Sequence, residues 1–163
     1  MAREKNFRGK KEKPEYEQKL LDLARVARVV KGGRRFRFRA TLVIGNRNGK
    51  VGVGVGKGAD VSDAIKKAFD DAKKNLITIV LNKNTIAHDI VHKVGSARII
   101  LKPASPGRGI IAGGAIRTVV DLAGIKDIVS KSLGTSNKLN VARAAIGAFE
   151  QLAEAKSRKS RIG

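Results

Sequence analysis

The chain has 163 residues, with 35 Lys and Arg against 14 Asp and Glu, and a formal net charge of +21 at pH 7. A cationic excess of this size favours contact with a polyanion, while a hydrophobic fraction of 42% supports a folded core and argues against wholesale disorder. The absence of Cys excludes disulfides and thiolate metal sites and suits a reducing cytoplasm, and we expect neither a bilayer-spanning segment nor a secretory leader.

The first 14 residues are predicted to form a basic tail, because residues 1–13 carry six Lys or Arg and almost no apolar side chains. Residues Glu15–Leu23 favour a short helix, and Val26–Val30 a strand that enters a turn at Gly32 and Gly33. The first folded unit is therefore expected to start near residue 15.

The segment after this turn alternates between apolar and cationic side chains. Because the side chains of a strand point to opposite faces with period two, each kind gathers on its own face. One face carries Phe36, Phe38, Ala40, Leu42 and Ile44, and the other carries Arg35, Arg37 and Arg39. The apolar face can be buried as core, whereas the arginines need water or a polyanion. We therefore predict that the arginine side meets nucleic acid.

Residues 45–49 are predicted to join two strands, Arg35–Ile44 and Lys50–Lys57, in a hairpin. The second strand alternates Val with Gly, and its bare glycine face permits the close approach of either a packed helix or RNA. A helix capped by Asp60, with Asp63 in its first turn, should follow. Its buried stripe is expected at Ile65, Ala68, Phe69, Ala72 and Leu76, and its basic exposed side at Lys66, Lys67, Lys73 and Lys74.

A second unit is expected from about residue 78, with no visible repeat of the first. Its predicted elements are strands at Thr85–Val94 and Ala97–Lys102, a helix through Ile116, Val119, Val120 and Ala123 that stops at Gly124, a strand at Ile128–Leu133, and an amphipathic helix from Val141 to Leu152. Residues 153–163 read as a second basic tail. Together the two units predict an α+β protein.

Two motifs resemble catalytic or cofactor sites, but their contexts do not support them. Gly54–Ala59 matches a dinucleotide-binding pattern, yet a hairpin precedes it and no acidic residue lies between Asp71 and Asp89 to hold a ribose. His88 and His92 have the spacing of a zinc-protease helix, but the intervening residues favour a strand, on which the two rings do not converge. We therefore expect no enzyme activity, no metal and no cofactor.

The loop 103–109, followed by Gly113 and Gly114 before a helix, has two interpretations. It can be an anion-binding nest that contacts an RNA phosphate with help from Arg108 and Arg117. It can equally be a rigid turn or a protein contact. Only 4% of the residues are aromatic, so phosphate contact and recognition of RNA shape are expected rather than base stacking on a sheet.

Several motifs, in order, make the chain resemble the family of bacterial small-subunit ribosomal protein five. They are Arg28–Phe36, Asn48–Gly52, Val53–Lys57, Leu101–Ser105 and Gly109–Gly114, within a similarity that runs from about residue 15 to 149. The resemblance implies an N-terminal double-stranded-RNA-binding-like domain, with a three-stranded antiparallel sheet plus a helix, at 15–79. It also implies a C-terminal α/β two-layer domain at 80–152, with basic tails at 1–14 and 153–163.

The family's role would make this chain a structural constituent of the small ribosomal subunit in the cytoplasm. The implied partners are 16S-type rRNA, ribosomal proteins four and eight, and messenger RNA at the entry channel, with no membrane. The implied roles are head–body organisation and translational accuracy. Pro106 and Arg108 stand where the family often has an acidic residue and Thr, which can direct this loop more toward RNA.

The candidate residues fall into two groups. Expected RNA-binding residues are Lys31, Gly32, Gly33, Arg34, Arg35, Arg37, Arg39, Arg47, Lys50, Lys57, Lys66, Lys67, Lys73, Lys74, Arg108 and Arg117. Expected protein-contact residues are Pro103, Ser105, Gly107 and Gly109. Two other functions remain as alternatives: a free regulator that binds structured nucleic acid, and a small-molecule kinase that uses the 103–114 loop for phosphate.

Overall fold

The computed structural model describes the backbone of residues 15–162 and the side chains of residues 15–153, so the predicted tail at 1–14 lies outside it. The N-terminal part forms one antiparallel sheet in the order β1-β2-β3-β4, and helix α1 follows β3 in the chain. The bounds are β1 Glu17–Val30, β2 Gly33–Gly45, β3 Lys50–Gly58, α1 Val61–Lys74 and β4 Leu76–Thr78. The predicted hairpin and helix are confirmed, and the short β4 adds a fourth strand.

The helix predicted at Glu15–Leu23 is wrong, because residues 17–23 form the first half of β1 and residues 15–16 form a bend. The strand pairs with β2 along its whole length, from Glu17 opposite Gly45 to Val30 opposite Gly33, with a register shift between Leu20 and Asp22. Its good helix formers give only a weak local preference, and the long-range ladder with β2 overrides it.

Helix α1 packs directly on the bare glycine face of β3. A Cβ at Gly52, Gly54 or Gly56 would overlap the backbone of Ala72, Ala68 or Ala64, all three of which are fully buried. Of the two occupants that the sequence allowed for this face, the packed helix is the one found. Asp60 stands at the N-cap position but its side chain makes no capping hydrogen bond, so the first turn starts from a backbone bond to its carbonyl.

The C-terminal part forms a mixed sheet in the order β5-β6-β8-β7, with α2 and α3 on one face. The bounds are β5 Ile90–Val94, β6 Ala97–Pro103, β7 Ile110–Ile111, α2 Gly114–Ala123, β8 Ile128–Leu133 and α3 Lys138–Ile162. The strand predicted from Thr85 begins only at Ile90, because residues 85–89 form a bridge and a bend. Helix α3 continues into the segment predicted as a tail. Of the described helices, none is both long and apolar enough to span a membrane.

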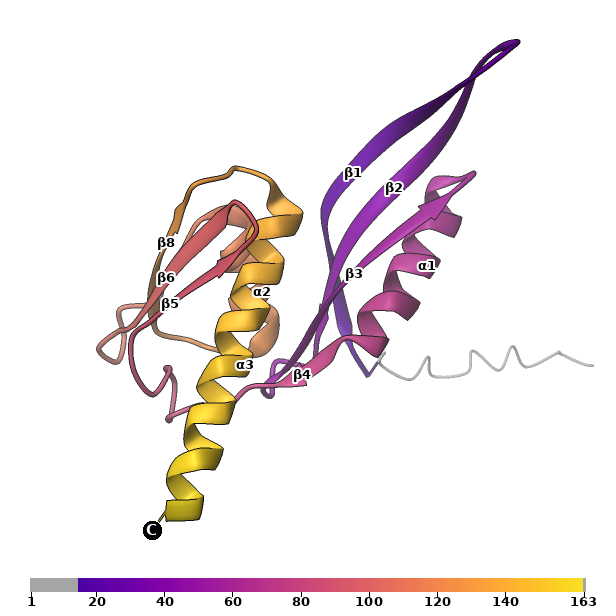
Figure 1. Ribbon diagram of the computed structural model, residues 1–163. Coiled ribbons are helices and arrows are strands. Elements are labelled where there is room, and N and C mark those ends of the chain that lie inside the picture. Colours follow the sequence, from indigo (N-terminus) through magenta and orange to yellow (C-terminus); the bar gives the residue numbers. More distant parts are fainter. Residues whose placement is uncertain (1–14, 163) are drawn as a thin grey trace, which may run out of the picture.

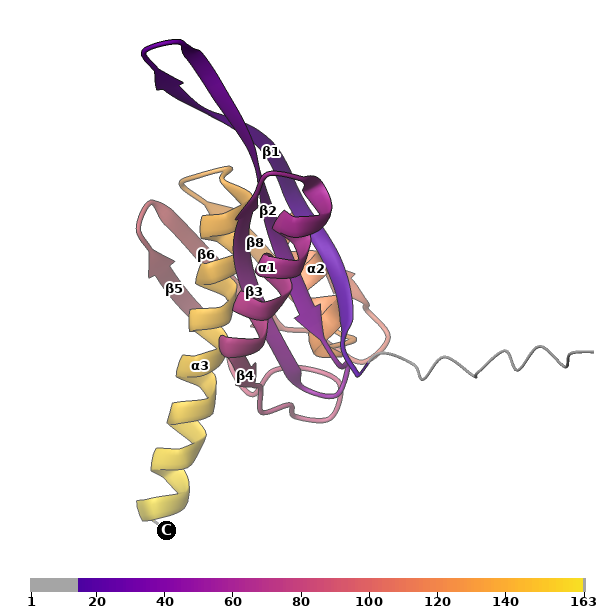
Figure 2. The same ribbon diagram turned by 90° about the vertical axis from the view of Figure 1, so that its right-hand side faces the viewer.

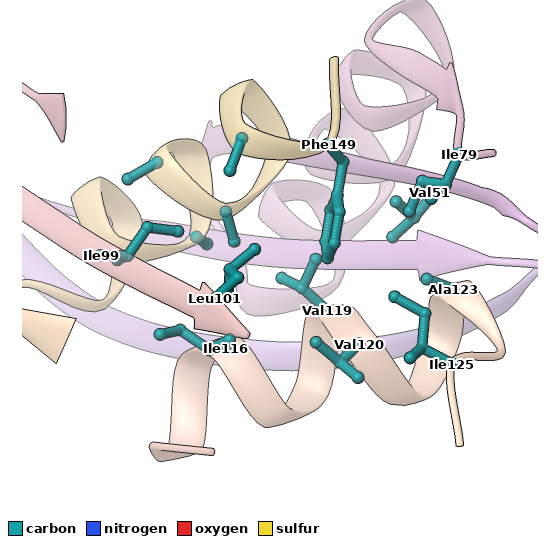
Figure 3. Packing of buried hydrophobic residues seen from close by; sticks show 14 of the residues in the cluster. Val51, Ile79, Ile99, Leu101, Ile116, Val119, Val120, Ala123, Ile125 and Phe149 are labelled. Atoms are coloured by element: carbon teal, nitrogen blue, oxygen red, sulfur yellow. The ribbon is translucent and has the colours of Figure 1, made fainter. Parts of the chain in front are cut away.

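The elements stack in four layers, with α1, the N-terminal sheet, the α2–α3 pair and the C-terminal sheet in succession (Figure 1). One cluster of buried side chains joins the last three layers. Phe149 of α3 lies at its centre, between Val119 of α2 and the N-terminal residues Val51 and Ile79 (Figure 3). The two parts of the chain therefore share a core, which fixes their relative orientation.

Ion pairs at the base of β1 reinforce this contact. Lys19 donates a hydrogen bond to Asp121 of α2, and Lys138 of α3 donates to Asp22 over 3.1 Å. The bond from Lys19 is the largest cause that lowers the pKa of Asp121, against a partial opposing effect of burial. The charges of Lys19, Arg47 and Arg117 lower this pKa further.

The far ends of β1 and β2 project beyond the rest of the sheet. The last pair between β2 and β3 is Phe38 with Gly58, so residues 25–38 continue as a two-stranded ribbon (Figures 1 and 2). We call this segment the ribbon. Nothing in the described chain covers its outer half, and Val29 near the tip is 75% exposed.

We expect Gly54→Ala to destabilise the fold, because its Cβ would overlap the backbone of Ala68 and Ala72. The expected loss in the free energy of unfolding is about 3 kcal/mol, the upper range for overpacking. Urea denaturation measures it, with Gly32→Ala as the control, since no atom lies within 4 Å of a Cβ there. A Gly54→Ala protein as stable as the control would contradict this packing.

The low pKa of Asp121 predicts a pH-dependent contribution to stability. Because the folded pKa lies below the unfolded value of about 3.9, the contribution is present above pH 4 and is lost as the pH falls through the folded pKa. Asp121→Asn should remove it, at a cost of about 0.5–1 kcal/mol near pH 6 that fades below pH 3. Denaturation between pH 2.5 and 7 tests this, with exposed Asp70→Asn as the control.

Candidate nucleic-acid interface

One side of the ribbon, together with the adjoining end of the sheet, gathers cations from three strands. Residues opposite each other in an antiparallel ladder share a face, which places Arg28 beside Arg35, and Lys57 beside Arg39. Arg37 lies between these two pairs. We call this surface the arginine face; it consists of Arg28, Arg35, Arg37, Arg39 and Lys57. The alternation predicted from the sequence is therefore present in β2, and Arg28 of β1 and Lys57 of β3 extend its cationic face.

The arginine face contains a hollow of about 490 Å³. Arg28, Arg35, Arg37 and Lys57 line it, together with small apolar side chains of β1. Among the described residues, none of these four cations forms a salt bridge. Residues 25–39 also contain no Asp or Glu. Unneutralised cations around a concave surface attract an anionic chain such as a phosphate backbone.

Arg39 differs from the other members of this face. Its guanidinium Nη2 lies 4.0 Å from the carboxylate of Asp22, which also accepts from Lys138. Its Nε is buried and has no hydrogen-bond partner among the described residues. Arg39 therefore stands at the boundary between the arginine face and the contact with α3, and its replacement would disturb both.

The turn at the tip of the ribbon is open on all sides. A Cβ at Gly32 or Gly33 would meet no atom within 4 Å, and Gly33 has a φ of +135°, which favours glycine. Lys31 and Arg34 flank the turn and are exposed. The tip thus offers cations and bare backbone to a partner that approaches end-on.

The lysines of α1 form a separate surface. Helix α1 covers the face of the N-terminal sheet opposite to the arginine face, so Lys66, Lys67, Lys73 and Lys74 do not join the arginines. Lys67 pairs with Asp63 at 2.8 Å, and this hydrogen bond is the largest cause that lowers the pKa of Asp63. Lys73 lies 4.7 Å from the centre of the Phe69 ring.

Arg47 and Lys50 lie at the other end of the sheet, away from the ribbon. The Arg47 guanidinium contacts Glu17 at 2.9 Å, and its backbone N–H donates to Leu122 of α2. This residue joins the two parts of the chain, so its position indicates a structural contribution. Lys50 is exposed at the start of β3, opposite Thr78.

The loop 103–109 is exposed at the edge of the C-terminal sheet. Gly107 and Gly109 have positive φ, and the N–H of Gly109 donates to the buried carboxylate of Asp127 over 2.9 Å. This donor of the predicted anion nest is therefore already bound, which favours the rigid-turn interpretation. Pro103, Ser105, Gly107 and Arg108 face solvent, and Arg117 lies near the carbonyl of Ile110.

His92 and Asp121 make contacts with neighbouring elements. Within the part of the chain that the structure describes, no group of three His, Cys, Asp or Glu is placed to hold a metal ion. His92 lies on β5 with its Nδ1 3.2 Å from Gln151 of α3, and His88 lies in the preceding bend. Asp121 of α2, a carboxylate that a kinase could use to hold magnesium, is bound by Lys19.

Arg28 and Arg25 are not among the RNA-binding residues expected from the sequence. Both belong to β1, which was expected to be a strand only from Val26. The turn at Gly32–Gly33 would have paired Arg28 with Arg35 by simple counting along the hairpin. Arg25 required the whole of β1 to be recognised as a strand, because it sits opposite Phe38 near the root of the ribbon.

Comparisons with known proteins match both parts of the chain. The family model described as Ribosomal protein S5, N-terminal domain, matches residues 16–80, and that described as Ribosomal protein S5, C-terminal domain, matches residues 92–161. A Small ribosomal subunit protein uS5 from Campylobacter jejuni strain 81-176 is 56% identical over 138 residues, covering 85% of this chain and 94% of the relative. The protein of the same name from strain RM1221 gives the same values.

The arginine face predicts a specific change in the salt dependence of RNA binding. Each lost phosphate contact should reduce the slope of log affinity against log salt by about 0.7–0.9. We therefore expect Arg28→Gln to weaken binding to small-subunit rRNA and to lower the slope by about this amount. Filter binding at several salt concentrations measures it. Lys83→Gln removes the same charge from an exposed loop and should leave the slope unchanged; equal slopes in both variants would contradict the assignment.

Proposed function

Because this chain belongs to the family of small-subunit ribosomal protein uS5, we propose that the ribbon is its principal rRNA-binding surface. As a member of that family, the protein is a structural constituent of the small ribosomal subunit, binds the rRNA of that subunit and is not an enzyme. One observation carries the proposal: the ribbon, residues 25–38, contains six Arg or Lys and no Asp or Glu.

The ribbon suits an RNA that surrounds it. It extends beyond the four packed layers, so phosphates can reach it without contact with the body of the protein (Figure 2). The arginine face supplies fixed cations, and the open turn at Gly32–Gly33 lets the backbone come close to RNA. In this proposal, the tip of the ribbon reaches the junction between the head and the body of the small subunit and bears on decoding there.

The lysines of α1 provide a second, weaker surface for the same RNA. Lys66, Lys67, Lys73 and Lys74 lie on the opposite side of the sheet, so they would contact another RNA segment. The loop residues Arg108 and Arg117 and the sheet-end residues Arg47 and Lys50 have a smaller part in this proposal. Arg47 is already paired with Glu17, and the loop amide of Gly109 is already bound by Asp127.

The C-terminal sheet offers a surface for neighbouring proteins. Its face away from α2 and α3 carries exposed apolar side chains, among them Val91, Ile111 and Leu133, which are 50%, 47% and 38% exposed. Lys93, Arg98, Lys102 and Lys131 are interleaved on the same face by the strand register. Mixed apolar and cationic faces of this kind suit protein partners. We assign ribosomal proteins four and eight to this face and to the loop at Pro103–Gly109.

The proposal also covers the domain limits, the basic terminal segments, the role of the C-terminal domain and the place where the protein acts. The double-stranded-RNA-binding-like domain spans residues 15–79 and the α/β domain residues 80–152. The segments 1–14 and 153–163 are basic and extend the contact with rRNA. The contacts of the C-terminal domain support translational accuracy and help to form the messenger RNA entry channel. The protein acts in the ribosomes of the cytoplasm.

Assembly into small subunits tests the proposal. Extracts of cells that carry Arg37→Glu should show less of the variant on small subunits after sedimentation through sucrose in high salt, because the substitution places a carboxylate on the arginine face. Lys83→Glu makes the same change of charge in a remote loop and should sediment like the wild type. Arg37 is preferred to Arg39, whose loss would also disturb the contact with Asp22.

A second arm of this experiment separates the protein contacts from the RNA contact. Leu133→Asp should retain the protection of rRNA by the ribbon but lose chemical cross-links to proteins four and eight. An Arg37→Glu protein that resists the high-salt wash as well as the wild type would overturn the assignment of the ribbon. A Leu133→Asp protein with unchanged cross-links would overturn the assignment of the outer sheet face.

A further inference from the structure

The side of the ribbon opposite the arginine face is largely apolar. Alternation along the two strands places Ala27 opposite Phe36 and Val29 opposite Arg34 on this side. Phe36 is 47% exposed and Val29 is 75% exposed. The ribbon is therefore two-sided, with cations on one face and an exposed aromatic ring on the other.

This apolar side has no cover within the described chain. Helix α1 packs on β3 and on the inner part of β2, where Ala40, Leu42 and Ile44 are buried, and it does not cover Phe36. A two-stranded ribbon without a packed face is only marginally stable in water. An exposed phenylalanine at such a place indicates a surface that is covered when the protein is bound to its partner.

Two arginines lie on the same side of the ribbon as the Phe36 ring. The guanidinium carbon of Arg25 lies over the ring at 3.7 Å from its centre, and Arg34 lies two residues away on the same side of the strand. An arginine stacked on an aromatic ring presents a π-surface and a positive charge together. The pair thus forms a small platform that is both apolar and cationic.

The chemistry of this platform favours a nucleic-acid base over an apolar protein surface. A base stacks on aromatic and guanidinium planes, and its phosphate can pair with the neighbouring cations. A purely apolar protein partner would have to bury Arg25 and Arg34 without any carboxylate from the ribbon to neutralise them, which is costly. Among the described residues, Phe36 is the one aromatic side chain that is exposed, so such stacking is proposed at this position alone.

We propose that Phe36 and Arg25 form a stacking site for one unpaired base of small-subunit rRNA, on the side of the ribbon opposite the arginine face. The inference rests on the proposed function and adds a contact to a base where that function requires only phosphates. The ribbon then lies between an RNA backbone on its cationic face and an extruded base on its apolar face. Such an arrangement fixes the ribbon from both sides.

Small subunits reconstituted without this chain and then supplied with purified variants test the proposal. Base-specific chemical probing reads the exposure of each base, and hydroxyl-radical cleavage reads the RNA backbone. Phe36→Leu keeps an apolar side chain but removes the ring, so it should free one base or a short run of bases. The equilibrium between stacked and free base should shift by about five- to 150-fold, the range for one aromatic stack. Backbone protection at the arginine face should persist.

Three further variants make the outcome decisive. Phe36→Tyr keeps the ring and should preserve the base protection. Arg25→Lys keeps the charge but removes the planar guanidinium, and should partly expose the same base; it also decides the question if Phe36→Leu fails to fold. Arg37→Gln should weaken backbone protection while the base remains stacked.

Distinct results separate the two proposals. If Phe36→Leu and Arg25→Lys leave every base as unreactive as in the wild type, the stacking site is overturned. A cross-link from position 36 to a ribosomal protein, with no change at any base, would identify a protein as the cover and would also overturn it. If Arg37→Gln leaves the backbone protection intact, the proposed use of the arginine face fails, whatever the result at Phe36.

Discussion

The close contact between α1 and the glycine face of β3 is the constraint on which the rest of the structure depends. Gly52, Gly54 and Gly56 leave no side chain between the strand and the helix, so the two backbones meet directly. This contact uses one face of the N-terminal sheet and leaves the other face free to pack on α2 and α3. The shared core around Phe149 then holds both domains in one orientation. The ribbon can extend from this sheet only because the sheet at its root is packed on both faces.

The packed part of the N-terminal sheet provides stability, and the unsupported ribbon provides the surface for RNA. The packed part of the N-terminal sheet buries the large apolar side chains. The ribbon, in contrast, keeps its cations without salt bridges and its aromatic ring exposed. Little in the fold stabilises the ribbon beyond its own ladder of backbone hydrogen bonds. Its shape is therefore expected to become fixed by what it binds, as for segments whose binding supplies the contacts that folding leaves unmade.

The sequence predicted most of the elements because their signals are local. Alternation of Phe36 and Phe38 with the arginines defined β2, and the period of Ala68 and Ala72 defined α1. The first half of β1 could not be predicted in this way, because its partners in β2, from Gly45 back to Ala40, lie far along the chain and its own residues favour a helix locally. The placement of the α1 lysines and of Arg47 needed the packing of layers that no local pattern contains. The position of Arg28 could be predicted by counting residues across the turn, whereas that of Arg25 could not.

The distribution of the acidic residues explains which part of this cationic chain is available to RNA. Three acidic residues lie away from the ribbon, where the two domains meet. Glu17 pairs with Arg47, Asp22 with Lys138 and Asp121 with Lys19. Exposed ion pairs of this kind add little to stability, so stability does not explain why they lie there. Their effect on the electrostatic field is larger: they neutralise cations where the two domains meet and leave the ribbon as a region of one sign. A phosphate backbone that approaches the protein is therefore drawn toward the ribbon, where both of its faces can be occupied.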